Sequence, residues 1–297
     1  MDALKNKISY LYEFLLSNKT KEKFERFILI VAILSFIIHL ALIYINQYTP
    51  FFSSKSELLG NPIGAIYTPF SFIILYEVYL LIFYLSRSIT TYISKQYEII
   101  SLIIIRRLFK DLSNLKLSSD WFSIKGDLQF TYDLIASVLL FYLLYWFYRL
   151  NKNRKKMLTE NSKLGLDIEK FISLKKLIAI GLVPTLLMLA FYTLGSWSYE
   201  TFFTGNTNID SFKNINNVFF DEFFTILIIV DVILLLVSFF YTDKFHKVIR
   251  NSGFVISTIL IRLSFSVDGL INTVLIVVAV VFGLLILAIH NTYEKHM

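Results

Sequence analysis

Long uninterrupted runs of apolar side chains alternate with short polar stretches along the whole chain. A helix needs about 20 apolar residues to cross the ~30 Å hydrocarbon layer of a bilayer. Six runs reach that length: Phe27–Asn46, Ile66–Leu85, Gln129–Leu150, Leu177–Trp197, Phe223–Tyr241 and Asp268–Ile289. The pattern therefore predicts an all-α, polytopic membrane protein.

Two further segments, Ile93–Phe109 and Ile249–Phe265, are rich in Ile and Leu but also carry charge. Their charged residues are Lys95, Glu98, Arg106, Arg107, Arg250 and Arg262. Taken alone, each segment fits either a helix that crosses the membrane or an amphipathic helix that lies flat in the interface. The charges of the neighbouring loops help to decide between the two.

Basic residues are concentrated in the N-terminal arm and in the linker Arg149–Lys176. By contrast, the loop after the first run has only Lys55, and the segment Ser198–Glu222 has only Lys213. Cytoplasmic loops of membrane proteins collect Lys and Arg. The arm and the linker lie on the same, cytoplasmic side only if Ile93–Phe109 crosses the membrane. For Ile249–Phe265 the loops are less informative, and the interpretation depends on an internal repeat.

The two halves of the chain resemble each other. Residues 100–109 read ISLIIIRRLF and residues 256–265 read ISTILIRLSF, with a serine and an arginine in register. The run before each segment holds one internal acid, Glu77 or Asp231, and the following run has an acid near its start, Asp133 or Asp268. We therefore predict eight transmembrane helices arranged as two parallel four-helix repeats.

This organisation divides the chain into five parts. They are a cytoplasmic N-terminal arm (1–26), a first membrane repeat (27–150), a basic cytoplasmic linker (151–176), a second membrane repeat (177–289) and a cytoplasmic tail (290–297). The arm mixes acids and bases, unlike a cleavable signal peptide. The expected location is the plasma (inner) membrane, with both termini in the cytoplasm.

Composition and charge agree with this picture and exclude several function classes. Apolar residues make up 56% of the chain and charged residues only 17%, which is too little polar surface for a soluble fold of this size. The net charge of +7 is explained by cytoplasmic loops, so nucleic acid is not an expected partner. There is no cysteine, the four histidines show no metal-ligand spacing, and no catalytic motif is present. We therefore predict a protein that is not an enzyme and has neither a cofactor nor a metal site.

The few charges inside the apolar runs are the candidate functional residues. An isolated intramembrane charge is costly, so such residues are expected to face the bundle interior and to be paired or hydrated. We predict the pairs Glu77–Arg106 and Asp231–Arg262, which act either as clamps that fix helix register or as a gate or path for ions. Alternative members of these pairs are Arg107, Asp133 and Asp268.

His39 lies within the first run, where it is either a hydrogen-bonded packing residue or a member of a proton relay. The basic run that begins the linker is either a topology signal alone or a contact for anionic lipid headgroups. Its residues are Lys152, Arg154, Lys155 and Lys156.

Two functions fit these features. The first is an ion-conducting channel or a transporter-like protein in which the arginine–carboxylate pairs form a gate or a path. The alternative is a non-transporting membrane subunit or effector that binds partner proteins and oligomerises. The expected partners are the lipid bilayer and either further copies of the chain or a partner membrane protein. Arg106 and Arg262 lining one water-filled cavity would favour ion permeation, whereas separate closed pairs would favour the subunit.

Overall fold

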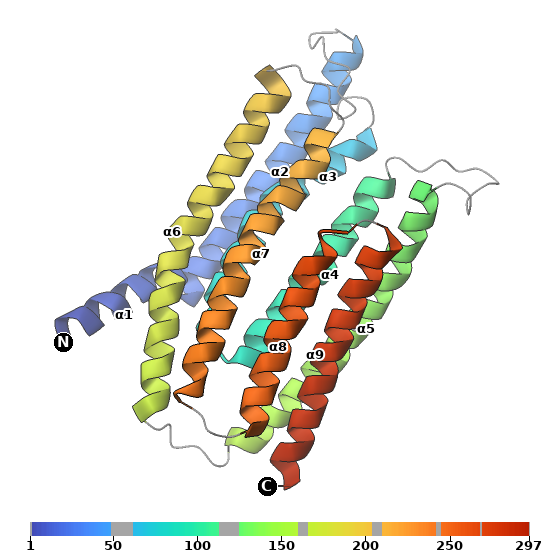
Figure 1. Cartoon of the computed structure of the whole chain (residues 1–297). Coiled ribbons are helices and arrows are strands. Elements are labelled where there is room, and N and C mark those ends of the chain that lie inside the picture. The colour runs from blue at the N-terminus through green and yellow to red at the C-terminus, as the bar shows by residue number, and fades with distance from the viewer. Residues whose placement is uncertain are drawn as a thin grey trace. The chain divides into compact units, whose positions relative to one another are not determined.

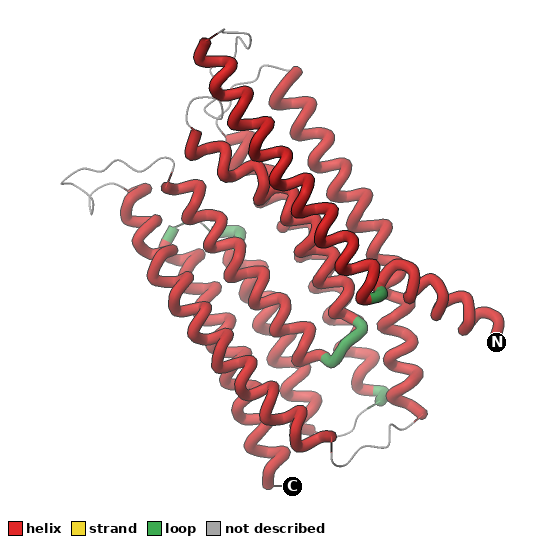
Figure 2. Tube along the Cα trace, turned by 180° about the vertical axis from the view of Figure 1, so that it is seen from behind, coloured by secondary structure: helices red, strands yellow, loops and turns green. Residues whose placement is uncertain are grey.

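The structure is a computed structural model that describes residues 2–48, 62–112, 125–159, 166–203, 210–241, 245–267 and 269–296. Within these ranges the chain forms helices joined by short turns and contains no strand, as Figure 2 shows. The prediction of an all-α protein is confirmed.

The elements are labelled in Figure 1. They are α1 (Asp2–Leu16), α2 (Asn18–Tyr48), the 3-10 helix η2 (Pro62–Ile66), α3 (Tyr67–Leu85), α4 (Ile89–Leu112), α5 (Lys125–Thr159), α6 (Leu166–Phe203), α7 (Asp210–Phe239), α8 (Phe245–Ser264) and α9 (Leu270–His296). Six helical stretches of the described chain are long and apolar enough to cross a membrane: Lys7–Asn46, Thr68–Leu85, Gly126–Lys152, Lys170–Thr193, Glu222–Phe239 and Leu270–His296. Each overlaps one of the six apolar runs of the sequence, and the first begins earlier, at Lys7 rather than Phe27.

The two ambiguous segments form the continuous helices α4 and α8, which bury several of their polar side chains inside the protein. The polar residues buried on α4 include Thr90, Ser94, Gln96 and Ser101, and those on α8 include Asn251, Ser257 and Thr258. A helix that lies flat in the interface keeps its polar face toward water. The low hydropathy of α4 and α8 therefore reflects a polar interior face.

Several helices extend beyond the apolar runs because their ends are set by caps and by good helix formers. Ser17 caps α2, since its Oγ accepts a hydrogen bond of 3.1 Å from the Thr20 amide. Ser88 caps α4 in the same way, with 3.3 Å to the Thr91 amide. Since α2 begins within the predicted arm and α5 continues to Thr159, the predicted part boundaries fall inside helices.

The chain forms two compact units. Unit 1 comprises residues 1–80, 106–130 and 180–222, and unit 2 comprises residues 81–105, 131–179 and 223–297. In unit 1, the ring of Tyr79 packs on Phe24 at 4.9 Å, and its hydroxyl donates to the Leu15 carbonyl at 2.8 Å. These contacts attach α1 and α2 to α3.

In unit 2, four helices meet around the ring of Tyr97. The Tyr97 hydroxyl and Ser257 Oγ lie 2.6 Å apart, which links α4 to α8, and Ser257 Oγ donates to the Ala279 carbonyl of α9 at 2.6 Å. Phe147 of α5 packs edge-on against Tyr97 at 5.3 Å. Gly283 of α9 lies directly against the Tyr97 hydroxyl, where a larger residue would collide with it. Small residues thus permit close helix packing at this point.

Candidate functional site

Glu77 of α3 and Arg106 of α4 form a closed ion pair in unit 1. Arg106 Nη2 donates to Glu77 Oε2 at 2.6 Å, and both residues are buried. Arg106 Nη1 lies 3.5 Å from the carbonyl oxygen of Phe70. The pair brings together the first two charges that the sequence predicts as partners.

The second predicted pair, Asp231–Arg262, does not form in the described part of the chain, and the prediction is corrected here. Asp231 Oδ2 instead accepts a hydrogen bond of 3.1 Å from Gln96 Nε2 of α4. Arg262 is half-buried and donates to Thr225 Oγ1 at 3.2 Å and to Ser266 Oγ at 3.4 Å.

The geometry of α7 explains this separation. Arg262 contacts α7 at Thr225, six positions before Asp231 in the helix. Six helical residues correspond to about 9 Å along the axis and about 120° around it. Arg262 therefore contacts α7 on another face of the helix than the one that carries Asp231.

Asp231 borders a small cavity, which we call the Asp231 cavity. Its volume is about 30 Å³, enough for one or two water molecules or a small cation. Tyr92 of α4, Lys175 of α6 and Asn251 of α8 also line it. Among the described residues, Gln96 Oε1 and the Tyr92 hydroxyl are buried oxygens without a hydrogen-bond partner. Asp231 and Tyr92 thus border the cavity itself, and Gln96 is hydrogen-bonded to Asp231 beside it.

Lys175 brings a positive charge to the same cavity as Asp231. Only 3% of the residue is exposed, and its Nζ donates to the Arg87 carbonyl at 2.7 Å. In the sequence, Lys175 reads as one of the basic residues of the linker, and its buried position is not predicted. A signal was present, because Lys175 precedes the buried residues Ala179 and Leu182 at the spacing of a single helix face.

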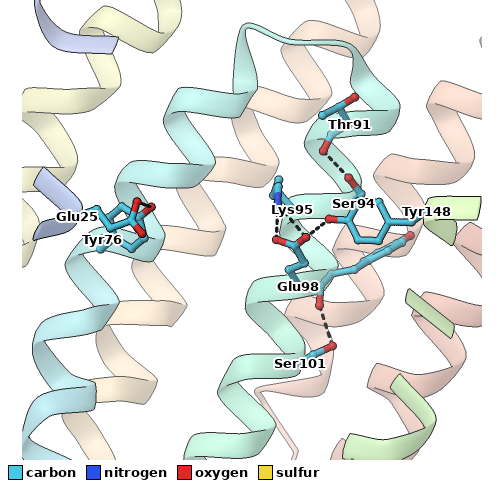
Figure 3. Close-up of polar contacts among 9 residues, drawn as sticks. Glu25, Tyr76, Thr91, Ser94, Lys95, Glu98, Ser101 and Tyr148 are labelled. Carbon is cyan, nitrogen blue, oxygen red and sulfur yellow. Dashed lines mark hydrogen bonds and ion pairs between the residues drawn. The ribbon is translucent and has the colours of Figure 1, made fainter. Parts of the chain in front are cut away.

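The charges on the middle of α4 are neutralised locally, as the close-up in Figure 3 shows. Lys95 Nζ donates to both carboxylate oxygens of Glu98, at 2.8 and 2.7 Å, and the Tyr148 hydroxyl donates to the same carboxylate. Lys95 also lies over the rings of Tyr84 and Tyr148. These contacts reduce the cost of placing two charges on a helix surrounded by apolar residues.

The other predicted site residues have separate positions. His39 of α2 is half-buried and hydrogen-bonded to the Thr68 hydroxyl. Asp133 is buried in α5 and accepts a hydrogen bond of 2.8 Å from Thr273 Oγ1. Arg107 is half-buried and Lys152 is exposed. Asp268 and the side chains of Arg154, Lys155 and Lys156 lie outside the described residues.

A second polar cluster, which the spacing of histidines in the sequence did not indicate, joins α8 to α9. The ligand atoms of His246, His290 and Glu294 all lie within 4.8 Å of one another. Both histidines are buried and their rings are stacked, with 5.2 Å between the centroids. The detectable signal was the separation of His290 and Glu294 by four residues, which puts both on one face of a helix.

No protein-family model matches the chain, and comparisons with curated proteins and with solved structures find no match either. The class of the protein therefore follows from its own features. It is an all-helical chain, over the residues described, with six helical stretches apolar enough to cross a membrane and with buried polar clusters between the helices.

Proposed function

We propose that this chain is a multi-pass membrane protein that translocates a small cation or a proton, and that Asp231 is the group that binds it. The observation that carries the proposal is the Asp231 cavity. A buried carboxylate there lies beside Tyr92, Gln96 and Lys175, at the boundary of a space large enough for an ion. Ionisable residues within membrane helices commonly mark ion pathways and proton relays.

The chemistry of the Asp231 cavity suits a positively charged ligand. Carboxylate, hydroxyl and amide oxygens are the ligands that hard cations prefer. Asp231 and Tyr92 border the cavity, and the amide of Gln96 lies beside the Asp231 carboxylate. The Lys175 ammonium opposes a second positive charge in the same space. Binding of a cation at Asp231 therefore favours either deprotonation of Lys175 or movement of its side chain. Occupancy of the site is in this way coupled to a change at Lys175.

In this proposal, the Glu77–Arg106 pair is a clamp that fixes the register of α3 and α4, rather than part of the path. The pair is closed and buried, and neither Arg106 nor Arg262 lines the Asp231 cavity. An arginine gate would require a cavity beside the guanidinium, so the buried carboxylate of Asp231 is the better candidate.

The proposed topology is eight spans in two parallel repeats, with both termini in the cytoplasm of a plasma-membrane protein. The buried polar faces of α4 and α8 support spanning rather than interfacial helices. An aromatic stack that occurs once in each half of the chain supports the proposed repeat. Phe70 stacks on Phe109 at 5.3 Å and 27°, and Phe224 stacks on Phe265 at 5.5 Å and 26°. Phe109 and Phe265 occupy matching positions in the two aligned segments.

The function is tested by cation and proton flux into liposomes that contain the purified chain. Wild type should conduct or exchange ions, and Asp231→Asn should remove at least about nine-tenths of the flux because the site loses its charge. The matched control is Asp133→Asn, which alters another buried aspartate and should leave the flux near the wild-type level. Absence of wild-type flux at every potential and pH gradient would contradict ion translocation and favour a non-transporting subunit or effector that acts through partner proteins.

A further inference from the structure

The contacts between α8 and α9 create a second site, distinct from the Asp231 cavity. His246 lies in the first turn of α8, and His290 and Glu294 lie in the last two turns of α9. The exposed fraction is 8% for His246 and 2% for His290, and Glu294 is half-buried. Two imidazoles and a carboxylate in one small volume are the ligand types of zinc sites.

His290 is oriented as metal-ligating histidines are. Its Nδ1 lies 3.2 Å from the carbonyl oxygen of His246, which can accept a hydrogen bond but cannot donate one. Nδ1 therefore carries the proton, and in the neutral ring the lone pair is on Nε2. A hydrogen bond from the distal ring nitrogen to a backbone carbonyl is the usual means by which proteins fix the tautomer and direction of a metal ligand.

Glu294 extends toward the same nitrogen. His290 Nε2 and Glu294 Oε1 are 3.2 Å apart, a separation close to that of two ligands on one tetrahedral zinc ion. His246 completes the set from the neighbouring helix. The ligand atoms lie within 4.8 Å of one another, so the widest separation shortens by at most roughly 1.4 Å to reach tetrahedral geometry. Three protein ligands leave the fourth position for water or another small ligand.

Arg250 is a cation already present at this position. Its Nη1 lies 3.0 Å from His290 Nε2 and donates to the nitrogen lone pair that a metal would use. Nε and Nη2 of the same guanidinium donate to Asn251 Oδ1 at 3.1 and 2.9 Å. A metal ion therefore displaces the hydrogen bond from Arg250 to His290, while the guanidinium remains held by its neighbour Asn251.

We propose that His246, His290 and Glu294 form a binding site for a divalent transition-metal ion, with Zn²⁺ as the best match to two imidazoles and a carboxylate. Arg250 competes with the metal for His290 Nε2 and so lowers the affinity of the site. This proposal is independent of ion translocation at Asp231.

The test is a Zn²⁺ titration of the purified full-length chain in detergent, with competition against a chromophoric zinc indicator. We expect one zinc ion per chain, and at least about tenfold weaker binding in His290→Gln. The glutamine side chain of this variant retains an amide donor for the His246 carbonyl but lacks the imidazole lone pair. Arg250→Met should change the affinity in the opposite direction, tightening it roughly three- to tenfold, because the competing hydrogen bond is removed.

The matched control is His296→Ala, which removes an exposed histidine from the last turn of α9 and should leave the zinc affinity unchanged. Glu294→Gln alters the most accessible ligand and gives a second test if His290→Gln does not fold. Zinc affinity that is unchanged in these ligand variants would overturn the proposal, as would weaker binding in Arg250→Met or the absence of stoichiometric binding. The visible absorption of bound Co²⁺ reports ligand geometry and should be lost in the same ligand variants.

Discussion

The helix pairs α3–α4 and α7–α8 carry the same kinds of residue at matching positions, yet they arrange their charges differently. Arg106 lies beside Phe70, seven residues before Glu77, and its guanidinium reaches the Glu77 carboxylate. Seven residues return to nearly the same face of a helix. Arg262 instead contacts Thr225, one position further along α7, and so faces away from Asp231. The two arginines thus contact the preceding helix at positions that differ by one residue. At one position the arginine reaches the carboxylate, and at the other it does not.

The difference has a chemical consequence. Glu77 is neutralised by a direct contact with Arg106, whereas Asp231 shares a cavity with Lys175 and accepts a hydrogen bond from the Gln96 amide. Closed buried ion pairs suit structural roles, and a carboxylate with accessible space suits binding. On the proposed function, one of the two carboxylates has a structural role and the other binds a ligand.

The largest expected effect distinguishes the two arginines. Arg106→Gln should lower the free energy of unfolding by about 3–5 kcal/mol, because it leaves Glu77 as a buried charge without its partner. Arg262→Gln should cost less, because the guanidinium is half-buried and does not pair with the Asp231 carboxylate. Both values can be measured by SDS titration in mixed micelles. Equal losses would mean that the arginines have the same role, contrary to the structure.

A double-mutant cycle identifies the counter-charge of Asp231. Lys175→Met should cost about 1–3 kcal/mol, because it removes the donor to the Arg87 carbonyl and the positive charge of the cavity. In the Asp231→Asn background the cost should be smaller, giving a coupling energy of roughly 0.5–3 kcal/mol. The corresponding cycle between Asp231 and Arg262 should give coupling close to zero. A coupling energy of Asp231 with Arg262 that exceeds its coupling energy with Lys175 would support the Asp231–Arg262 pair that the sequence predicts.

The sequence was sufficient for properties that depend on local pattern. The lengths of the apolar runs identified the six stretches that are apolar enough to span, and the charges at positions 77 and 106 indicated two residues that the structure brings together. The partner of Asp231 could not be derived in this way. Gln96 lies on another helix, 135 residues earlier in the chain, and its selection depends on how the helices rotate about their axes.

The histidine cluster likewise could not be derived from the sequence alone. The spacing of four between His290 and Glu294 can be read from the sequence, but His246 is 44 residues before His290. Only the antiparallel packing of α8 against α9 brings the first turn of one helix to the last turns of the other. Motif spacing identifies residues that share a face, and tertiary packing then determines which faces meet.

The packing around Tyr97 offers a further comparison at matching positions. Tyr97 of α4 packs against Gly283 of α9, while its counterpart Gly253 of α8 lies against Ile286 of α9. Gly283→Ala should cost about 1–3 kcal/mol by overpacking against the Tyr97 hydroxyl. Tyr97→Phe should recover part of that loss in the Gly283→Ala protein, although it costs about 0.5–1.5 kcal/mol alone by breaking the contact with Ser257. Additive costs would contradict the direct contact.

The smallest expected effect tests the feature that the two helix pairs share. Phe109→Leu and Phe265→Leu each retain an apolar side chain but remove the ring that stacks on Phe70 or Phe224. Each should cost about 0.5–1.5 kcal/mol, the usual contribution of an aromatic pair beyond its buried area. The two stacks have nearly identical separations and angles, so the losses should agree to within about 0.5 kcal/mol even though Arg106→Gln and Arg262→Gln differ by several. Equal ring contributions beside unequal arginine contributions would indicate that the two helix pairs share their aromatic packing although their carboxylates have different roles.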